Sequence, residues 1–113
     1  MSDSTVILFT RFGIGDAPAD LQHKLVRVFL TLLEKTNPLP RQMLFYTEGV
    51  KLVCTGSPVL EQLRTFQAQG VEMVICSTCL NYFEITDQVQ VGIVGGMGDI
   101  LESITRADKV VSV

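Results

Sequence analysis

Two cysteines three residues apart offer the most specific chemistry in this chain. Cys76 and Cys79 directly follow the apolar run 71–75, at a point where a strand is expected to end and a helix to begin. At such a junction, unsatisfied backbone N–H groups and the helix dipole favour a thiolate over a thiol. Positions i and i+3 of a helix share a face, so the two sulfurs come within disulfide-bonding reach. The pattern predicts a reactive pair, in which one thiolate accepts sulfur or attacks a disulfide and the other resolves the adduct.

The residues around the pair supply hydrogen-bond donors but no positive charge. Ser77 and Thr78 stand between the cysteines, and we expect their hydroxyls to line the site. The nearest charged residues along the chain are Glu72, Glu84 and Asp87, which disfavour a thiolate, so activation has to come from the backbone or from residues that folding brings close. The alternative is that both cysteines are small buried hydrophobes.

A zinc site is an alternative use of two closely spaced cysteines, but the chain has too few further ligands. Tetrahedral zinc needs four ligands, and only Cys54 and His23 remain as soft ones. His23 is expected to face solvent on the first helix, and Cys54, between Val53 and Thr55, is expected to serve packing. We therefore expect no metal.

Two cofactor or redox folds are also disfavoured. A thioredoxin places its cysteine pair early and a proline later, whereas here no proline follows Pro58. Gly13-x-Gly15 misses the dinucleotide pattern G-x-G-x-x-G, because Pro18 stands at the third glycine. We expect no cofactor.

Composition sets the broad class. The 113 residues suit a single domain, 1–113, and 47% of them are apolar, which favours a homo-oligomer. The net charge is −3 and the basic residues are scattered, which argues against nucleic acid. No apolar run approaches the ~20 residues of a membrane span, and the start of the chain does not resemble a signal peptide. We expect a cytoplasmic protein with reduced cysteines and no membrane association.

The apolar segment just beyond the cysteines is a candidate covering or interface surface. Tyr82, Phe83 and Ile85 are more apolar than a solvent-exposed loop requires. We expect them to cover the site or to meet another subunit.

The hydrophobic period alternates between strand-like and helix-like segments. Strands are expected at 6–9, 43–46, 71–75, 91–94 and 109–113. The first helix is expected to bury Leu21, Leu25, Val28, Phe29, Leu32 and Leu33, and the last to bury Met97, Ile100, Leu101 and Ile104. Ser57 is expected to cap a helix that begins at Pro58. The pattern predicts an α/β fold, a three-layer α/β/α sandwich on a five-stranded, mainly parallel sheet.

A glycine-rich loop follows the fourth expected strand. Sites in parallel sheets form at the carboxyl ends of the strands, and the third and fourth strands are neighbours in the commonest five-strand orders. We therefore expect Gly95, Gly96 and Gly98 to line the site beside the cysteines.

Several segments together resemble a known family. They are Glu48-Gly49-Val50-Lys51-Leu52, Gly56-Ser57, Gly70-Val71-Glu72, Cys76-x-Thr78-Cys79-Leu80 and Ala107-Asp108-Lys109-Val110. Together they are similar to the C-terminal domain of YedF-type selenium-metabolism proteins, which belong to the DsrE/DsrF-like sulfur-relay family. The chain departs from that pattern mildly, with Ser77 in place of a glycine and Asn81 in place of an aspartate.

The resemblance implies a function. It implies a DsrE-like, oligomerising sandwich that is sulfurtransferase-like and carries sulfur, or selenium, as a persulfide on Cys76, with Cys79 as the resolving thiol. The small carrier domain that often precedes such a domain has no counterpart in this sequence, so separate proteins are expected to donate and accept the sulfur. The alternatives are a non-catalytic oligomeric interaction domain and a dithiol/disulfide redox protein.

Overall fold

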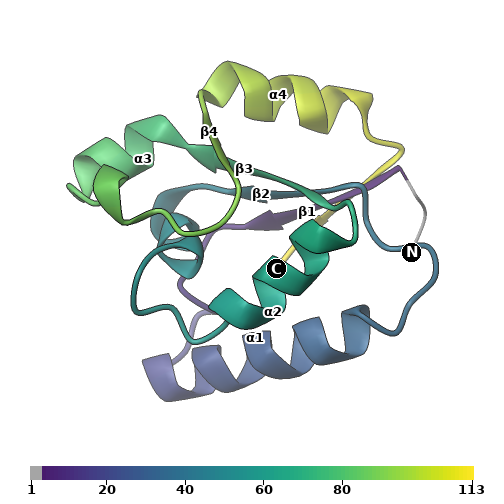
Figure 1. The fold of residues 1–113 in the computed structure, drawn as a ribbon, viewed down its shortest axis with the longest axis horizontal. Helices are drawn as coiled ribbons and strands as arrows, with labels where there is room; N and C mark the ends of the chain where they lie inside the picture. The colour runs from purple at the N-terminus through teal and green to yellow at the C-terminus, as the bar shows by residue number, and fades with distance from the viewer. Residues whose placement is uncertain (1–3) are drawn as a thin grey trace.

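The computed structural model describes residues 4–113 and shows a parallel sheet flanked by helices (Figure 1). The strands are β1 (Thr5–Phe9), β2 (Gln42–Phe45), β3 (Glu72–Cys76), β4 (Ile93–Gly95) and β5 (Lys109–Ser112). They lie in the order β4-β3-β2-β1-β5, and every neighbouring pair is parallel. The predicted five-stranded α/β sandwich is confirmed, and β3 lies between β2 and β4.

The helices form the two outer layers. They are α1 (Ala19–Leu33), α2 (Leu60–Ala68), α3 (Ser77–Tyr82) and α4 (Met97–Arg106), with the 3₁₀ turns η1 (Thr47–Val53) and η2 (Thr86–Gln88). The helix α4 covers one face of the sheet, and α1 and α2 cover the other (Figure 1). Within residues 4–113 no helix has the length and apolarity that crossing a membrane requires.

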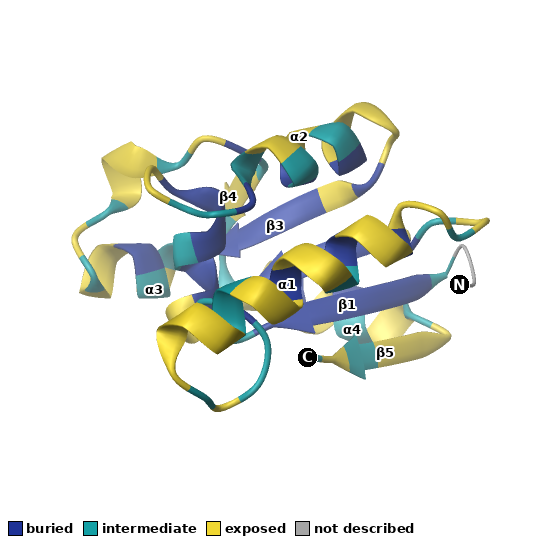
Figure 2. Cartoon of the chain, turned by 90° about the horizontal axis from the view of Figure 1, so that it is seen from below, coloured by how far each residue is buried: buried dark blue, intermediate teal, exposed yellow. Residues whose placement is uncertain are grey.

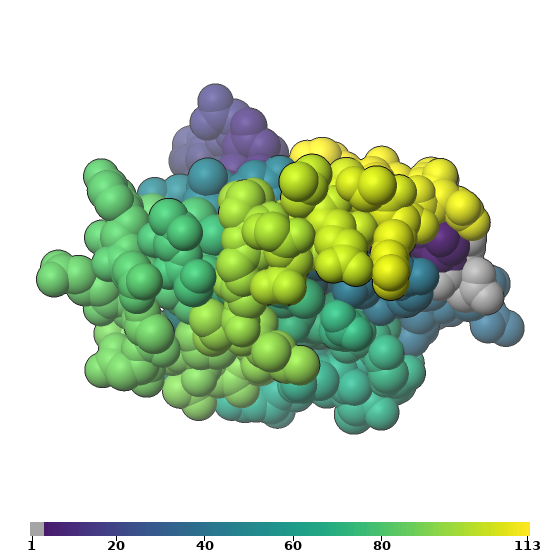
Figure 3. Space-filling model, turned by 90° about the horizontal axis from the view of Figure 1, so that it is seen from above, coloured from purple at the N-terminus to yellow at the C-terminus, as the bar shows by residue number. Residues whose placement is uncertain are grey.

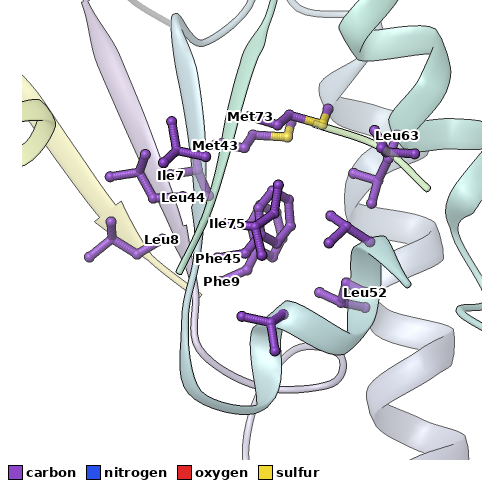
Figure 4. Packing of buried hydrophobic residues seen from close by; sticks show 14 of the residues in the cluster. Ile7, Leu8, Phe9, Met43, Leu44, Phe45, Leu52, Leu63, Met73 and Ile75 are labelled. Carbon is purple, nitrogen blue, oxygen red and sulfur yellow. The ribbon is translucent and has the colours of Figure 1, made fainter. Parts of the chain in front are cut away.

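The core forms on the three central strands. Every residue of β1 and β2 is buried, as are the last four of β3, whereas β4 and β5 at the edges are largely exposed (Figure 2). On the α1 side, Phe9 stacks on Phe45 with ring centroids 5.0 Å apart, and Ile75 continues this row (Figure 4). Continuous apolar runs suit strands that are covered on both faces.

The predicted core face of α1 is largely wrong. The helix buries Val26, Leu30 and Leu33 against the sheet, so only Leu33 of the expected set is fully buried. Four expected core residues are instead exposed: Leu21 (45%), Leu25 (40%), Val28 (49%) and Leu32 (59%). The two apolar stripes lie roughly a third of a turn apart on the helix, and spacing alone does not show which one faces the sheet.

Smaller corrections concern other element boundaries and faces. On α4, Ile100 is buried but Met97 and Leu101 are 49% and 63% exposed. The helix α2 begins at Leu60, two residues later than expected, because the Ser57 hydroxyl accepts the Val59 N–H (3.2 Å) in a turn before the helix. The expected strands differ from the observed ones by one or two residues at their ends, as is usual for sequence-based boundaries.

Candidate functional site: a buried and an accessible thiol

The two cysteines lie at the junction of β3 and α3. Cys76 is the last residue of the strand and the N-cap of the helix, and Cys79 lies in the first turn of α3. The Cys76 side chain is 0% exposed, whereas Cys79 is half-buried, and neither forms a disulfide. The structure therefore divides the predicted pair into a buried thiol and an accessible one.

A backbone donor reaches the accessible thiol from the neighbouring strand. The Thr47 N–H, just after β2, donates a hydrogen bond to Cys79 Sγ at 3.1 Å. Thr47 has φ +50°, a left-handed conformation that is unfavourable for a β-branched residue. Its hydroxyl donates to the Thr10 carbonyl, just beyond β1, at 2.6 Å, and this bond helps to hold the strained turn.

Gly49 allows this turn to lie against the end of β1. A Cβ at Gly49 would lie 1.9 Å from the Phe9 carbonyl oxygen, which is closer than two non-bonded atoms can lie. The Tyr46 N–H donates to the same Phe9 oxygen at 3.2 Å, and the Gly49 N–H donates to the Tyr46 carbonyl at 3.0 Å. Close backbone packing therefore positions the amide that reaches Cys79.

The surroundings of Cys79 act on its ionisation in opposite directions. Burial raises the pKa of the Cys79 thiol above its ordinary value, and Cys76 raises that pKa further through a hydrogen bond and through its charge. The Thr47 N–H opposes these effects and lowers the pKa, but the net direction is upward. The expectation that the junction favours a thiolate is therefore wrong for Cys79.

The first glycine of the predicted lining lies beside Cys76. Gly95 pairs with Cys76 across β3 and β4, so the glycine loop begins beside the pair, as its sequence position predicts. A Cβ at Gly95 would lie 3.0 Å from the Asp99 carboxylate, so this glycine serves close packing. Gly96 is the N-cap of α4 and donates its N–H to the Asp99 carboxylate at 2.8 Å.

The remaining predicted lining residues lie on the surface side of the junction. Ser77 is half-buried and Thr78 is exposed, both in the first turn of α3. Gly98 is exposed in the first turn of α4, and a Cβ there would meet nothing within 4 Å. A role for these three residues in lining the site stays a prediction.

The segment that carries Thr47 also holds the end of α3. Lys51 Nζ lies 4.4 Å from the ring centroid of Phe83 and 2.5 Å from a carboxylate oxygen of Glu48. A cation over an aromatic ring is attracted by its quadrupole. By contrast Tyr82 is 82% exposed, so it does not cover the site, and its expected alternative role in contacting another subunit stays a prediction.

The third cysteine and the histidine lie outside the site. Cys54 is 2% exposed, its Sγ donates to the Val50 carbonyl at 3.3 Å, and burial raises the pKa of its thiol, so it serves packing as expected. His23 does not face solvent as expected: it is half-buried, with its ring 4.7 Å from that of Phe12. No group of three or more His, Cys, Asp or Glu gathers among residues 4–113 to hold a metal ion.

A hollow of about 500 Å³ lies between α4 and the edge of the sheet. It is lined by α4, by β4 with Gly95, and by residues of β2 and β3 that include Gln42 and Glu72, and neither Cys76 nor Cys79 lines it. Figure 3 shows the face that carries α4, with α3 projecting at the far end. The hollow therefore reaches the residue that pairs with Cys76, namely Gly95, but includes neither thiol.

The family model and the fold together give the class of this protein. The model of the DsrE/DsrF-like family matches residues 12–113, and the chain belongs to that family. No curated protein matches the sequence closely enough to indicate a relationship.

Solved structures show the same fold at low sequence identity. The ychN protein from E. coli is 20% identical with a TM-score of 0.71, over 96% of this chain and 97% of that one. BT1422 from Bacteroides thetaiotaomicron is 17% identical with a TM-score of 0.72, over 98% and 95%. MTH1491 from Methanobacterium thermoautotrophicum is 18% identical with a TM-score of 0.66, over 96% and 98%. The last two are described as proteins of unknown function.

Sequence reasoning misses the residue that contacts the accessible thiol. Nothing in the sequence pattern singles out Thr47. The position of Thr47 follows from the strand order. Because β2 and β3 are parallel neighbours, the turn after β2 lies beside the segment that follows β3. The strand order, however, cannot be read from the sequence.

Proposed function

We propose that this protein is a sulfur-relay protein that carries sulfur as a cysteine persulfide on the Cys76–Cys79 pair. The observation that carries the proposal is the pairing of a buried thiol with an accessible one at the carboxyl end of β3, in a protein of the DsrE/DsrF-like family. A sulfane sulfur has to be received from outside and then kept from cellular thiols, and one exposed and one buried sulfur suit these two needs.

In this proposal Cys76 holds the sulfur and Cys79 resolves the adduct. The Cys79 thiolate attacks the inner sulfur of the Cys76 persulfide, forms the Cys76–Cys79 disulfide and expels the outer sulfur as hydrosulfide. The outer sulfur is reduced and the two cysteines are oxidised, so a cellular dithiol is required to reopen the disulfide. The chemistry uses no cofactor.

The partners are proposed from chemistry alone. The sulfur has to come from another molecule and to be taken up by another after its release, so separate donor and acceptor proteins are part of the proposal. The segment Cys76-x-Thr78-Cys79-Leu80 supports the narrower relation to YedF-type proteins and, with it, selenium as an alternative cargo.

Intact-mass spectrometry tests the proposed function. Wild-type protein incubated with a sulfane-sulfur donor is expected to gain one sulfur atom, which a dithiol reductant removes. The double variant Cys76→Ala/Cys79→Ser is expected to gain none, and Cys54→Ser serves as the matched control that gains sulfur like the wild type. A wild type that neither gains sulfur nor releases hydrosulfide would refute the proposal: two unreactive thiols would then favour an interaction domain, and a reversible disulfide formed without hydrosulfide release would favour a redox protein.

We also propose that the chain self-associates through α1. The exposed residues Leu21, Leu25, Val28 and Leu32 are separated by four, three and four positions, the spacing of a helix-to-helix seam. The same stripe on a second copy provides a self-complementary partner, as in a two-fold dimer. Sedimentation should show an oligomer for the wild type and a smaller species for Leu25→Lys, whereas a monomeric wild type would refute the proposal.

A further inference from the structure

We propose that sulfur is received first by Cys79 and then passed inward to Cys76. This inference rests on the proposed function and adds a direction to it. The resemblance to sulfur-relay proteins places the persulfide on Cys76, but it does not say how sulfur reaches a buried thiol.

Access is the first argument. A donor persulfide must bring its sulfane sulfur into contact with the attacking sulfur, and Cys76, at 0% exposure, presents no surface to such a donor. Cys79 is half-buried in the first turn of α3, three positions after Cys76 at the N-cap, and side chains at this spacing are neighbours. A donor can therefore meet Cys79 without any opening of the fold, and Cys79 can in turn meet Cys76.

The Thr47 N–H group, which points at Cys79, also favours Cys79 as the receiving thiol. The Thr47 N–H lies 3.1 Å from Cys79 Sγ, in a turn that is strained at a β-branched residue. Strained backbone persists where surrounding structure enforces it, and such positions cluster at functional sites. An N–H directed at sulfur stabilises an anion there, and Cys79 bears negative charge both when it attacks the donor and when it leaves.

Both transfers conserve atoms and electrons. The Cys79 thiolate attacks the outer sulfur of the donor persulfide; a new S–S bond forms at Cys79, and the donor thiolate leaves. The Cys76 sulfur then attacks the outer sulfur on Cys79, the bond to Cys79 breaks, and the proton of the Cys76 thiol passes to the Cys79 sulfur. No oxidant or reductant is consumed in either step, since the sulfane sulfur keeps its oxidation state.

Loading rates of single variants test the direction. With the same sulfane-sulfur donor, Cys79→Ser is expected to load at least roughly tenfold more slowly than wild type, since only the buried thiol remains. Cys76→Ala is expected to load on Cys79 at least as fast as wild type, because Cys76 raises the pKa of Cys79, and to lose its sulfur faster to added dithiol. Cys54→Ser is the control for replacing a cysteine, and unfolding curves of each variant confirm that it is folded.

The outcomes separate this inference from the proposed function. If wild type and Cys79→Ser load equally fast with sulfur on Cys76, the inward transfer is wrong while the persulfide function stands. If Cys76→Ala fails to load although it is folded, the inference also fails. If wild type itself takes up no sulfur, the proposed function fails first.

Discussion

Replacing Gly49 with alanine is expected to destabilise the protein strongly, in contrast to the same exchange at Gly98. The new Cβ would lie 1.9 Å from the Phe9 carbonyl oxygen, so either η1 or the end of β1 has to move. Overpacking of this kind lowers the free energy of unfolding by about 1–3 kcal/mol. The Phe9 carbonyl is a backbone group, so it cannot avoid the new Cβ by a side-chain rotation. Thermal unfolding should show Tm lowered by roughly 5–20 °C.

Gly98→Ala is the matched control for this loss. Gly98 lies inside α4, a Cβ added there would have no atom within 4 Å, and alanine favours a helix over glycine. Its Tm is expected to stay the same or rise. A Gly49→Ala protein as stable as wild type would show that the turn is not pressed against β1, and the position of the Thr47 amide would lose its explanation.

Thr47→Val is expected to slow the reaction of Cys79 with an alkylating agent at neutral pH by roughly tenfold. Valine keeps the shape of threonine but lacks the hydroxyl that binds the Thr10 carbonyl, so the strained turn relaxes and its N–H leaves the sulfur. That N–H lowers the pKa of Cys79, and its loss raises the pKa further. The thiolate fraction at neutral pH falls, and the pH profile of alkylation moves to higher pH.

Three variants separate the amide from the side chain in this experiment. Thr47→Ser keeps the hydroxyl and is expected to react like wild type. Thr47→Gly keeps the N–H and accepts a positive φ without strain, so Cys79 should also stay reactive. Thr105→Val removes a comparable hydroxyl on α4, remote from the site, and should change nothing. An unchanged pH profile for Thr47→Val would show that the amide does not act on the thiol.

The sheet was predictable from the sequence because its strands are short, mainly apolar segments bounded by turn residues. The run Val6-Ile7-Leu8-Phe9 is buried on both faces, as a central strand of a small α/β domain requires. The site was predictable in part for a similar reason: Cys76 ends a buried strand, and parallel sheets place chemistry at that end.

The orientation of α1 and the contact at Thr47 were not predictable, for different physical reasons. The helix α1 carries apolar residues over more than one stripe, so the hydrophobic period is satisfied by several rotations, and only packing selects Val26 and Leu30. Thr47 contacts Cys79 across 32 positions of sequence, because β2 pairs with β3. The hydrophobic pattern of the sequence does not show which strands are neighbours in the sheet.

Mapping the sulfur atom within the loaded wild-type protein shows directly whether Cys76 carries a persulfide. After reaction with the sulfane-sulfur donor, the protein is digested without reduction and the peptides are fragmented in the mass spectrometer. We expect one additional sulfur on the segment with Cys76 and Cys79, located on Cys76 until Cys79 releases it, and none on Cys54. Additional sulfur on Cys54 alone, or on no cysteine of a folded protein that also releases no hydrosulfide, would refute the proposal.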